Sequence, residues 1–328
     1  MPLSSNRLNE LTSAFAAQKI LVIGDLMLDE FIWGKVSRIS PEAPVPVVDV
    51  QRSEFYPGGA ANVVRNLCSF TRHSSMAGVI GQDSAGEKIL DLLKQDGAAV
   101  SAVLQSASRP TTLKTRIIAR QQQVVRVDRE TKEKLADADH QWLIDKIAAL
   151  VGQHDAIIIE DYAKGLVDQR LVTRVIEEAR KQKKIIAIDP NPHNALDFTG
   201  ASAIKPNRSE AFQMAGLEFS ETRDDLMRAA EILQNKWDPQ YLFITLSEEG
   251  VLLLEKGAQP YHTPTRAQQV YDVSGAGDTS IAVFTLALAA GATGPEATDL
   301  ANHAAGVVVG KLGTATLTLD ELRASFGS

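Results

Sequence analysis

The stretch ILVIGD at residues 20–25 decides the expected fold, because four apolar residues run directly into a glycine and an acid. This pattern predicts a strand that is buried on both faces of a parallel sheet and followed by a functional loop. The same pattern recurs at residues 156–159, 185–188 and 242–245, where each apolar run ends at or just before polar side chains. The chain is therefore expected to supply several buried parallel strands.

Helical patterns separate these strands, for example at residues 171–182 and 223–235. Alternation of strands and helices predicts an α/β fold, with a mostly parallel sheet covered by helices on both faces. In such sheets ligands bind beyond the carboxyl ends of the strands. Asp25, the acidic pair at 160–161 and Asp189 fall at those ends, so we expect the functional site there.

Two segments depart from this pattern. Residues 45–55 and 111–128 alternate polar and apolar side chains, which is typical of half-exposed antiparallel strands. We therefore expect a single domain over residues 1–328 with a small β-sheet lid, formed by approximately residues 35–56 and 111–128.

The composition excludes some classes of function. The 328 residues carry a net charge of −7, which argues against nucleic-acid binding, although a local cluster of Lys and Arg could still bind a small anion. Residues 1–20 lack a signal-peptide pattern, and the longest apolar stretch, residues 281–290, is shorter than the roughly 20 residues of a membrane span. Cys68, the one cysteine, is expected to fill the core. We expect a soluble cytoplasmic protein without a nucleic-acid or membrane partner.

A glycine-rich turn, DVSGAGD at residues 272–278, precedes the apolar helix predicted at 281–290. Small residues before a helix leave its first N–H groups open, so that a phosphate can approach the backbone. The helix N-terminus also carries roughly half a positive elementary charge. The turn is therefore a candidate anion hole for the charge that develops on a transferring phosphoryl group.

Asp278 gives this turn its specific chemistry. A carboxylate in an anion-binding turn would repel phosphate, so it is explained best if it faces a hydroxyl that loses a proton. In phosphoryl transfer such a base mainly orients the nucleophile. The alternative is that Asp272 or Asp278 only caps the helix. P-loop, dinucleotide-binding and zinc-protease motifs are absent.

A second motif, GGAAN at residues 58–62, precedes a helical run at 63–70; alone it could be a tight turn. Together with residues 272–278 it resembles the signatures of the ribokinase-like (PfkB) family of carbohydrate kinases. The resemblance extends from the strand at residue 20 to a helix around 301–309. It implies a doubly wound α/β domain with a β-lid, and an ATP-dependent phosphotransferase that acts on an alcohol group and uses Mg²⁺. Activation by a monovalent cation is left open.

The resemblance also implies roles for individual residues. Asp278 would be the catalytic base, and the N–H groups of Gly275, Ala276 and Gly277 would form the anion hole. The pair Asn207 and Glu210 resembles the family's N-x-x-E motif, which holds magnesium through water, as the hydration of Mg²⁺ favours. The same pair also fits a helix capping box. The further nucleotide contacts that the resemblance implies are Arg208, Ser209, Thr245, Ser247, Gly250 and Asn302.

Within the family the chain is most similar to the heptose-7-phosphate kinases of lipopolysaccharide core synthesis. The similarity is carried by residues 24–29 (GDLMLD), 38–47 (RISPEAPVPV) and 161–165 (DYAKG). It implies phosphorylation of the anomeric hydroxyl of D-glycero-β-D-manno-heptose 7-phosphate to the 1,7-bisphosphate. In many bacteria this kinase is fused to a nucleotidyltransferase, and we expect the chain to be the stand-alone form.

A sugar phosphate needs hydrogen-bonding groups and cations. Asp25 and Asp29 suit pairs of hydroxyls, although Asp29 could be a surface-loop acid. Lys114 and Arg116 share a strand face and could grip the distal phosphate, although each lid cation alone could be merely solvated. The other candidates for the sugar and its phosphate are Gly58, Gly59, Asn62, Arg38, Arg120 and Lys164.

Two alternative functions remain at this point. One is another family kinase, acting on fructose 6-phosphate, tagatose 6-phosphate, ribose or a nucleoside. The other is a nucleotide-binding regulator without turnover, although such a protein would not need Asp278. Because family members pair through the lid, we also expect a homodimer that uses the strands around residues 124–125.

Overall fold

The computed structural model describes residues 3–119, 122–267, 269–311 and 313–327. Within these ranges a nine-stranded sheet has the order β13-β12-β11-β10-β9-β8-β1-β4-β5. Neighbouring strands from β11 to β5 are parallel, whereas β12 and β13 add antiparallel at one edge. The strands are β1 (Ile20–Gly24), β4 (Ser74–Gly81), β5 (Ala99–Ser106), β8 (Ala156–Glu160), β9 (Ile185–Asp189), β10 (Ala203–Ile204), β11 (Tyr241–Thr245), β12 (Val251–Glu255) and β13 (Tyr261–Thr263).

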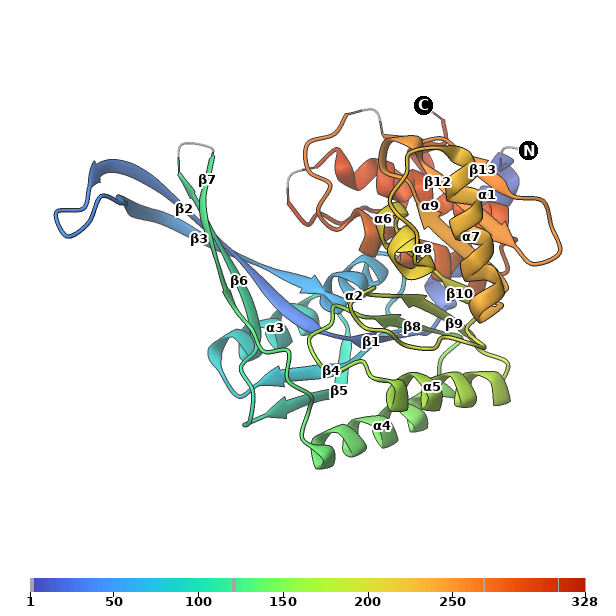
Figure 1. Ribbon diagram of the computed structural model, residues 1–328, viewed down its shortest axis with the longest axis horizontal. Coiled ribbons are helices and arrows are strands. Elements are labelled where there is room, and N and C mark those ends of the chain that lie inside the picture. Colours follow the sequence, from blue (N-terminus) through green and yellow to red (C-terminus); the bar gives the residue numbers. More distant parts are fainter. Residues whose placement is uncertain (1–2, 120–121, 268, 312, 328) are drawn as a thin grey trace.

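Helices cover both faces of this sheet (Figure 1). In β1, Ile20 and Val22 belong to one buried core, while Leu21 and Ile23 belong to the other, because successive side chains of a strand point to opposite faces. The first core packs against α1 (Ser5–Ala14), α2 (Ala60–Cys68), α3 (Ser84–Gln95), α8 (Ala276–Ala289), α9 (Gly294–Val309) and α10 (Leu319–Ser325). The second packs against α4 (Asp137–Val151), α5 (Gln169–Lys181), α6 (Arg208–Ala215) and α7 (Arg223–Trp237). Two short 3-10 helices are η1 (Phe15–Ala17) and η2 (Ser247–Glu249).

The predicted α/β fold is confirmed. The four apolar runs form β1, β8, β9 and β11, and the two helical patterns form α5 and α7. Helix α8 begins at Ala276, earlier than the apolar run suggests, so that Asp278 lies in its first turn. Cys68 ends α2 and is half-buried against the first core, where burial raises the pKa of its thiol to about 11. No helix in the described ranges is long and apolar enough to span a membrane.

The small sheet projects away from the body of the molecule (Figure 1). Its order is β3-β2-β6-β7, and β2 pairs parallel with β6, so the expected wholly antiparallel pairing is wrong at this one step. Its strands extend beyond the residues that alternation predicts. Strand β2 was predicted too short because its first residues are buried and apolar in succession, and so do not alternate. The residues of β7 are exposed on both faces, and not half-exposed. The strands are β2 (Leu26–Ile39), β3 (Pro46–Gly59), β6 (Thr112–Ala119) and β7 (Gln122–Arg129).

Candidate active site

The N-terminus of α8 lies near the carboxyl ends of β8 and β9, and Asp278 lies at that junction. Its side chain is 8% exposed. The Tyr162 hydroxyl donates to Asp278 Oδ1 at 2.7 Å, and the Asn62 amide donates to Oδ2 at 2.7 Å. Burial raises the pKa of Asp278, and these two hydrogen bonds oppose that rise. The carboxylate is therefore held in a fixed orientation by donors from α2 and from the loop after β8.

The turn before α8, predicted as an anion hole, starts the helix at a glycine with no side-chain cap. Gly275 is the N-cap residue with φ 82°, and a Cβ there would lie 2.7 Å from the Asn62 amide nitrogen. Neither carboxylate of the motif caps the helix: Asp278 contacts Asn62 and Tyr162, and Asp272 accepts from the backbone of Ser274 at 2.9 Å. Of the three N–H groups predicted to form the anion hole, that of Ala276 donates a long hydrogen bond of 3.3 Å to Val273 O.

A buried cation lies beneath this turn. Lys205 Nζ is 2.8 Å from Asp189 Oδ2, and it would lie 3.5 Å from a Cβ placed on Gly277. Burial lowers the pKa of Lys205, but the charge of Asp189 and its hydrogen bond to the ammonium outweigh this effect, and the pKa is raised. Burial raises the pKa of Asp189 to about 7, although Lys205 opposes the rise. The ammonium therefore adds positive charge to the helix N-terminus.

Glu160, at the end of β8, is fully buried. Its two carboxyl oxygens have no hydrogen-bond partner among the residues that the structure describes. Burial raises its pKa well above the usual range, and the negative charges of Asp189 and Asp278 add to the effect. Burial therefore favours the protonated, uncharged form of Glu160, which limits the negative charge beside the glycine-rich turn.

The predicted sugar ligand Asp25 is tied to the loop after β8. Its Oδ2 accepts from the backbone N–H groups of Tyr162 and Lys164, both at 3.1 Å. Burial raises the pKa of Asp25, and these backbone hydrogen bonds oppose the rise. Part of its hydrogen-bonding capacity is therefore used to fix this loop.

Asp29 is a buried residue of β2 and not a surface-loop acid. Its Oδ1 pairs with Arg116 at 2.5 Å, and the Arg116 guanidinium lies over the Phe31 ring. A Cβ on Gly58 would come within 2.5 Å of Asp29 Oδ2, so glycine is needed at that position. Gly59, the N-cap residue of α2, has φ 59°.

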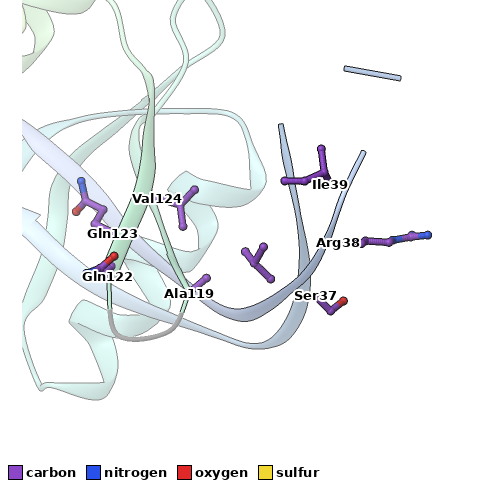
Figure 2. A pocket seen from close by; sticks show the side chains of 8 residues that line it. Ser37, Arg38, Ile39, Ala119, Gln122, Gln123 and Val124 are labelled. Atoms are coloured by element: carbon purple, nitrogen blue, oxygen red, sulfur yellow. The ribbon is translucent and has the colours of Figure 1, made fainter. Parts of the chain in front are cut away.

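The predicted cations separate into two groups. Lys114, Arg116 and Lys164 gather at the base of the lid, where burial and the charge of Lys164 lower the pKa of Lys114; Lys164 Nζ also pairs with Glu130 at 2.8 Å. Arg38 instead lines a groove near the far end of β2 (Figure 2). Arg120 lies outside the described residues.

Among the residues predicted to contact the nucleotide, Asn207 and Glu210 form the capping box of α6, with hydrogen bonds of 3.0 and 2.7 Å. Across the described part of the chain, no group of three or more His, Cys, Asp or Glu is placed to hold a metal ion. An amide and a carboxylate oxygen suit Mg²⁺ that keeps most of its waters. The two residues therefore fit the predicted water-mediated magnesium contact.

The other candidate nucleotide residues surround this box. The backbone of Asn207 forms an isolated parallel β-bridge with Thr245 at the end of β11. Arg208 pairs with Glu249 of η2 at 2.7 Å, and Asn302 of α9 donates to Pro264 O at 2.6 Å. The remaining three are Ser209, exposed on α6, and Ser247 and Gly250, which have φ 53° and 91° in the turn around η2.

A model of the pfkB family carbohydrate kinases matches residues 17–321. The chain belongs to the PfkB family of carbohydrate kinases. It is therefore a phosphotransferase that acts on an alcohol group, and the family implies the use of ATP. It is 43% identical over 321 residues to the bifunctional protein HldE of Magnetococcus marinus, covering 96% of this chain and 65% of that protein. The HldE protein of Helicobacter pylori strain J99 is 44% identical over 305 residues, covering 93% and 65%. The chain thus spans about two thirds of the length of these relatives.

Solved structures confirm the ribokinase-like fold of this PfkB kinase. Arabidopsis thaliana ribokinase complexed with ribose and ATP superposes with a TM-score of 0.73 at 17% identity, over 94% of this chain and 98% of that one. The tetrameric inhibited form of phosphofructokinase-2 from Escherichia coli gives 0.75 at 18% identity, over 94% and 98%.

Sequence reasoning assigned no role to Tyr162, Lys205 or Arg109. The Arg109 guanidinium donates to Lys164 O at 2.6 Å, and its charge acts on Asp25. A signal for the first two was present, because Tyr162 and Lys205 closely follow β8 and β10, where parallel strands place their ligands.

Proposed function

We propose that this PfkB kinase transfers the γ-phosphoryl group of ATP to the anomeric hydroxyl of D-glycero-β-D-manno-heptose 7-phosphate, for lipopolysaccharide core biosynthesis. The observation that carries the reaction is the buried Asp278 carboxylate, held by Asn62 and Tyr162 at the open N-terminus of α8. The choice of heptose rests on the similarity at residues 24–29, 38–47 and 161–165.

In this proposal the sugar oxygen forms a bond to the γ-phosphorus while the bond from that phosphorus to the bridging oxygen breaks. The hydroxyl proton passes to Asp278, which aligns the oxygen for attack. The first amides of α8 and the nearby Lys205 ammonium stabilise the charge on the transferring group. Mg²⁺, when bound, would neutralise charge on the phosphates, with Asn207 and Glu210 acting through water.

The cations at the base of the lid support a phosphorylated sugar as the substrate. Lys114, Arg116 and Lys164 come from two separate segments and converge beside Asp29, which itself contacts Arg116. A half-buried ammonium next to another ammonium is electrostatically unfavourable, and a dianionic phosphate would relieve that repulsion. We propose that these residues bind the 7-phosphate while the small sheet acts as a lid over the sugar.

A panel of sugars in an ADP-release assay tests the substrate. We expect turnover with heptose 7-phosphate and little with heptose that lacks the phosphate, fructose 6-phosphate, tagatose 6-phosphate or ribose. Lys114→Met should raise the KM for the sugar phosphate about tenfold or more, since it removes a charge-assisted contact. The same change at Lys35, exposed on β2, should leave KM unchanged. Activity with an unphosphorylated sugar and none with heptose 7-phosphate would refute the assignment.

We also propose a homodimer through the lid. Strand β7 is an edge strand, and Val124, Val125 and Val127 on it are 40–54% exposed. Beside it lies a groove of about 480 Å³ between β7 and the far end of β2, shown in Figure 2. An exposed apolar edge strand is prone to pair with another chain, and a second copy of the same strand would cover it.

A further inference from the structure

Tyr162 contacts the proposed base directly, and the reaction as described above gives its hydroxyl no task beyond holding the carboxylate. The residue lies in the loop after β8, and its hydroxyl is 2.7 Å from Asp278 Oδ1. Asn62 occupies the other carboxylate oxygen. A carboxylate oxygen can accept more than one hydrogen bond, so Tyr162 leaves room for a sugar hydroxyl at the same carboxylate.

The loop that carries Tyr162 is fixed from several sides. The Tyr162 N–H donates to Asp25 Oδ2 at 3.1 Å, and the Ala163 N–H donates to Asp161 Oδ1 at 2.8 Å. Asp161 Oδ2 in turn accepts from the Asn194 amide at 3.0 Å. The tyrosine is therefore anchored before substrate binds, and it does not need to reorganise to reach Asp278.

We propose that Tyr162 is a positioning residue for the base: its hydroxyl holds Asp278 in one orientation and stabilises its anionic form until the sugar hydroxyl arrives. This inference rests on the proposed role of Asp278. A hydrogen bond to the charged form of a carboxyl favours that form, and bonds to charged acceptors are stronger than neutral ones. Tyr162 keeps its own proton, because burial and the charge of Asp278 raise its pKa well above the usual range.

Other charged groups also face Asp278. Lys205, which precedes α6, favours the anion, whereas Asp29 on β2 disfavours it. Glu160 at the end of β8 and Asp189 at the end of β9 are also close enough to interact with its charge. Because these groups remain when only the Tyr162 hydroxyl is removed, a change in the titration of Asp278 reports on that one hydrogen bond.

Tyr162→Phe tests the inference with the full chain, ATP, Mg²⁺ and the sugar phosphate that the panel identifies. We expect kcat to fall about 10- to 100-fold, the effect of losing a hydrogen bond to a charged group. The acid limb of kcat/KM for the sugar should move up by about one pH unit, because Asp278 then binds its proton more tightly. The matched control is Tyr261→Phe, which removes a tyrosine–Asp299 hydrogen bond of 2.9 Å between β13 and α9 and should change neither quantity.

A second variant separates positioning from a structural role. Replacing Tyr162 by 3-fluorotyrosine keeps the size of the ring and makes the hydroxyl a stronger donor, so the acid limb should move to lower pH. Opposite shifts in the two variants support the inference. An acid limb that stays in place with 3-fluorotyrosine overturns it, even if Tyr162→Phe fails to fold. Full turnover in Asp278→Asn would overturn both the inference and the proposed base, whereas an inactive Asp278→Asn with unmoved Tyr162 variants overturns the inference alone.

Discussion

At the scale of single residues, the site holds buried carboxyl groups in two different hydrogen-bonding environments. Asp278 receives two hydrogen bonds from neutral donors, which favour its anion. Glu160 receives none from the described residues, and the negative charges of Asp189 and Asp278 act on it. The difference suits a kinase, because one carboxylate must accept a proton while further negative charge would repel the phosphates.

Glu160→Gln tests the raised pKa of Glu160 through stability. Since the folded-state pKa lies above the unfolded value of about 4.3, wild-type stability falls as the pH rises from there through the folded-state pKa. Glutamine has no proton to lose, so the unfolding temperature of the variant relative to wild type should be higher at pH 8 than at pH 5, by about 2–4 °C. Glu218→Gln, at an exposed position, is the control. A difference that is the same at both pH values contradicts the interpretation.

At the scale of elements, the N-terminus of α8 brings the proposed base and the proposed anion hole together. Gly275 makes this possible, because its positive φ starts the helix without a side chain and leaves Asn62 in place. The loop after β8 adds a second connection, since it contacts Asp25 and Asp278 while Lys164 pairs with Glu130 just after β7. One short segment therefore links the lid to Asp25, the proposed sugar ligand, and to Asp278, the proposed base.

Gly275→Ala should lower both stability and turnover. A non-glycine residue at φ 82° costs about 1–2 kcal/mol, and its Cβ would displace the Asn62 amide from Asp278. Gly257→Ala is a matched control, with φ 80° and no atom of the described residues within 4 Å of the new Cβ. Thermal unfolding should show a similar loss in both variants, whereas only Gly275→Ala should lose kcat. Equal kcat in the two variants would argue against the role of Asn62 at the base.

At the scale of the whole molecule, the projecting lid is the surface that we propose joins two copies. Val125→Lys should convert a dimer into monomers of 35.5 kDa, since it places a charge on the exposed edge strand. Trp142→Lys, at a position on α4 that is 43% exposed, serves as the control and should leave the assembly unchanged. Sedimentation velocity measures both. A wild-type chain that sediments as a monomer would contradict the proposed homodimer.

The sequence predicts the fold well where burial leaves a local pattern. The runs at 156–159 and 185–188 are recognisable because both faces of a parallel strand are covered. The first residues of β2 were not predicted as part of the small sheet, since they are apolar in succession and do not alternate with polar side chains. The contact between Tyr162 and Asp278 joins positions far apart in the chain, and no spacing rule reports it. The motif at 272–278 could be recognised from the sequence, because it places the proposed base and the proposed anion hole next to each other in one turn.

The central claim, that Asp278 is the base of an ATP-dependent kinase, is tested most directly by Asp278→Asn. The amide has nearly the same size and cannot accept the proton, so kcat should fall by about 10²–10⁴. The affinity for ATP should stay close to that of wild type, because Asp278 contacts Asn62 and Tyr162 and is proposed to face the sugar. Turnover by ADP release and ATP binding by calorimetry give the two numbers. A variant that turns over at nearly the wild-type rate would contradict the account.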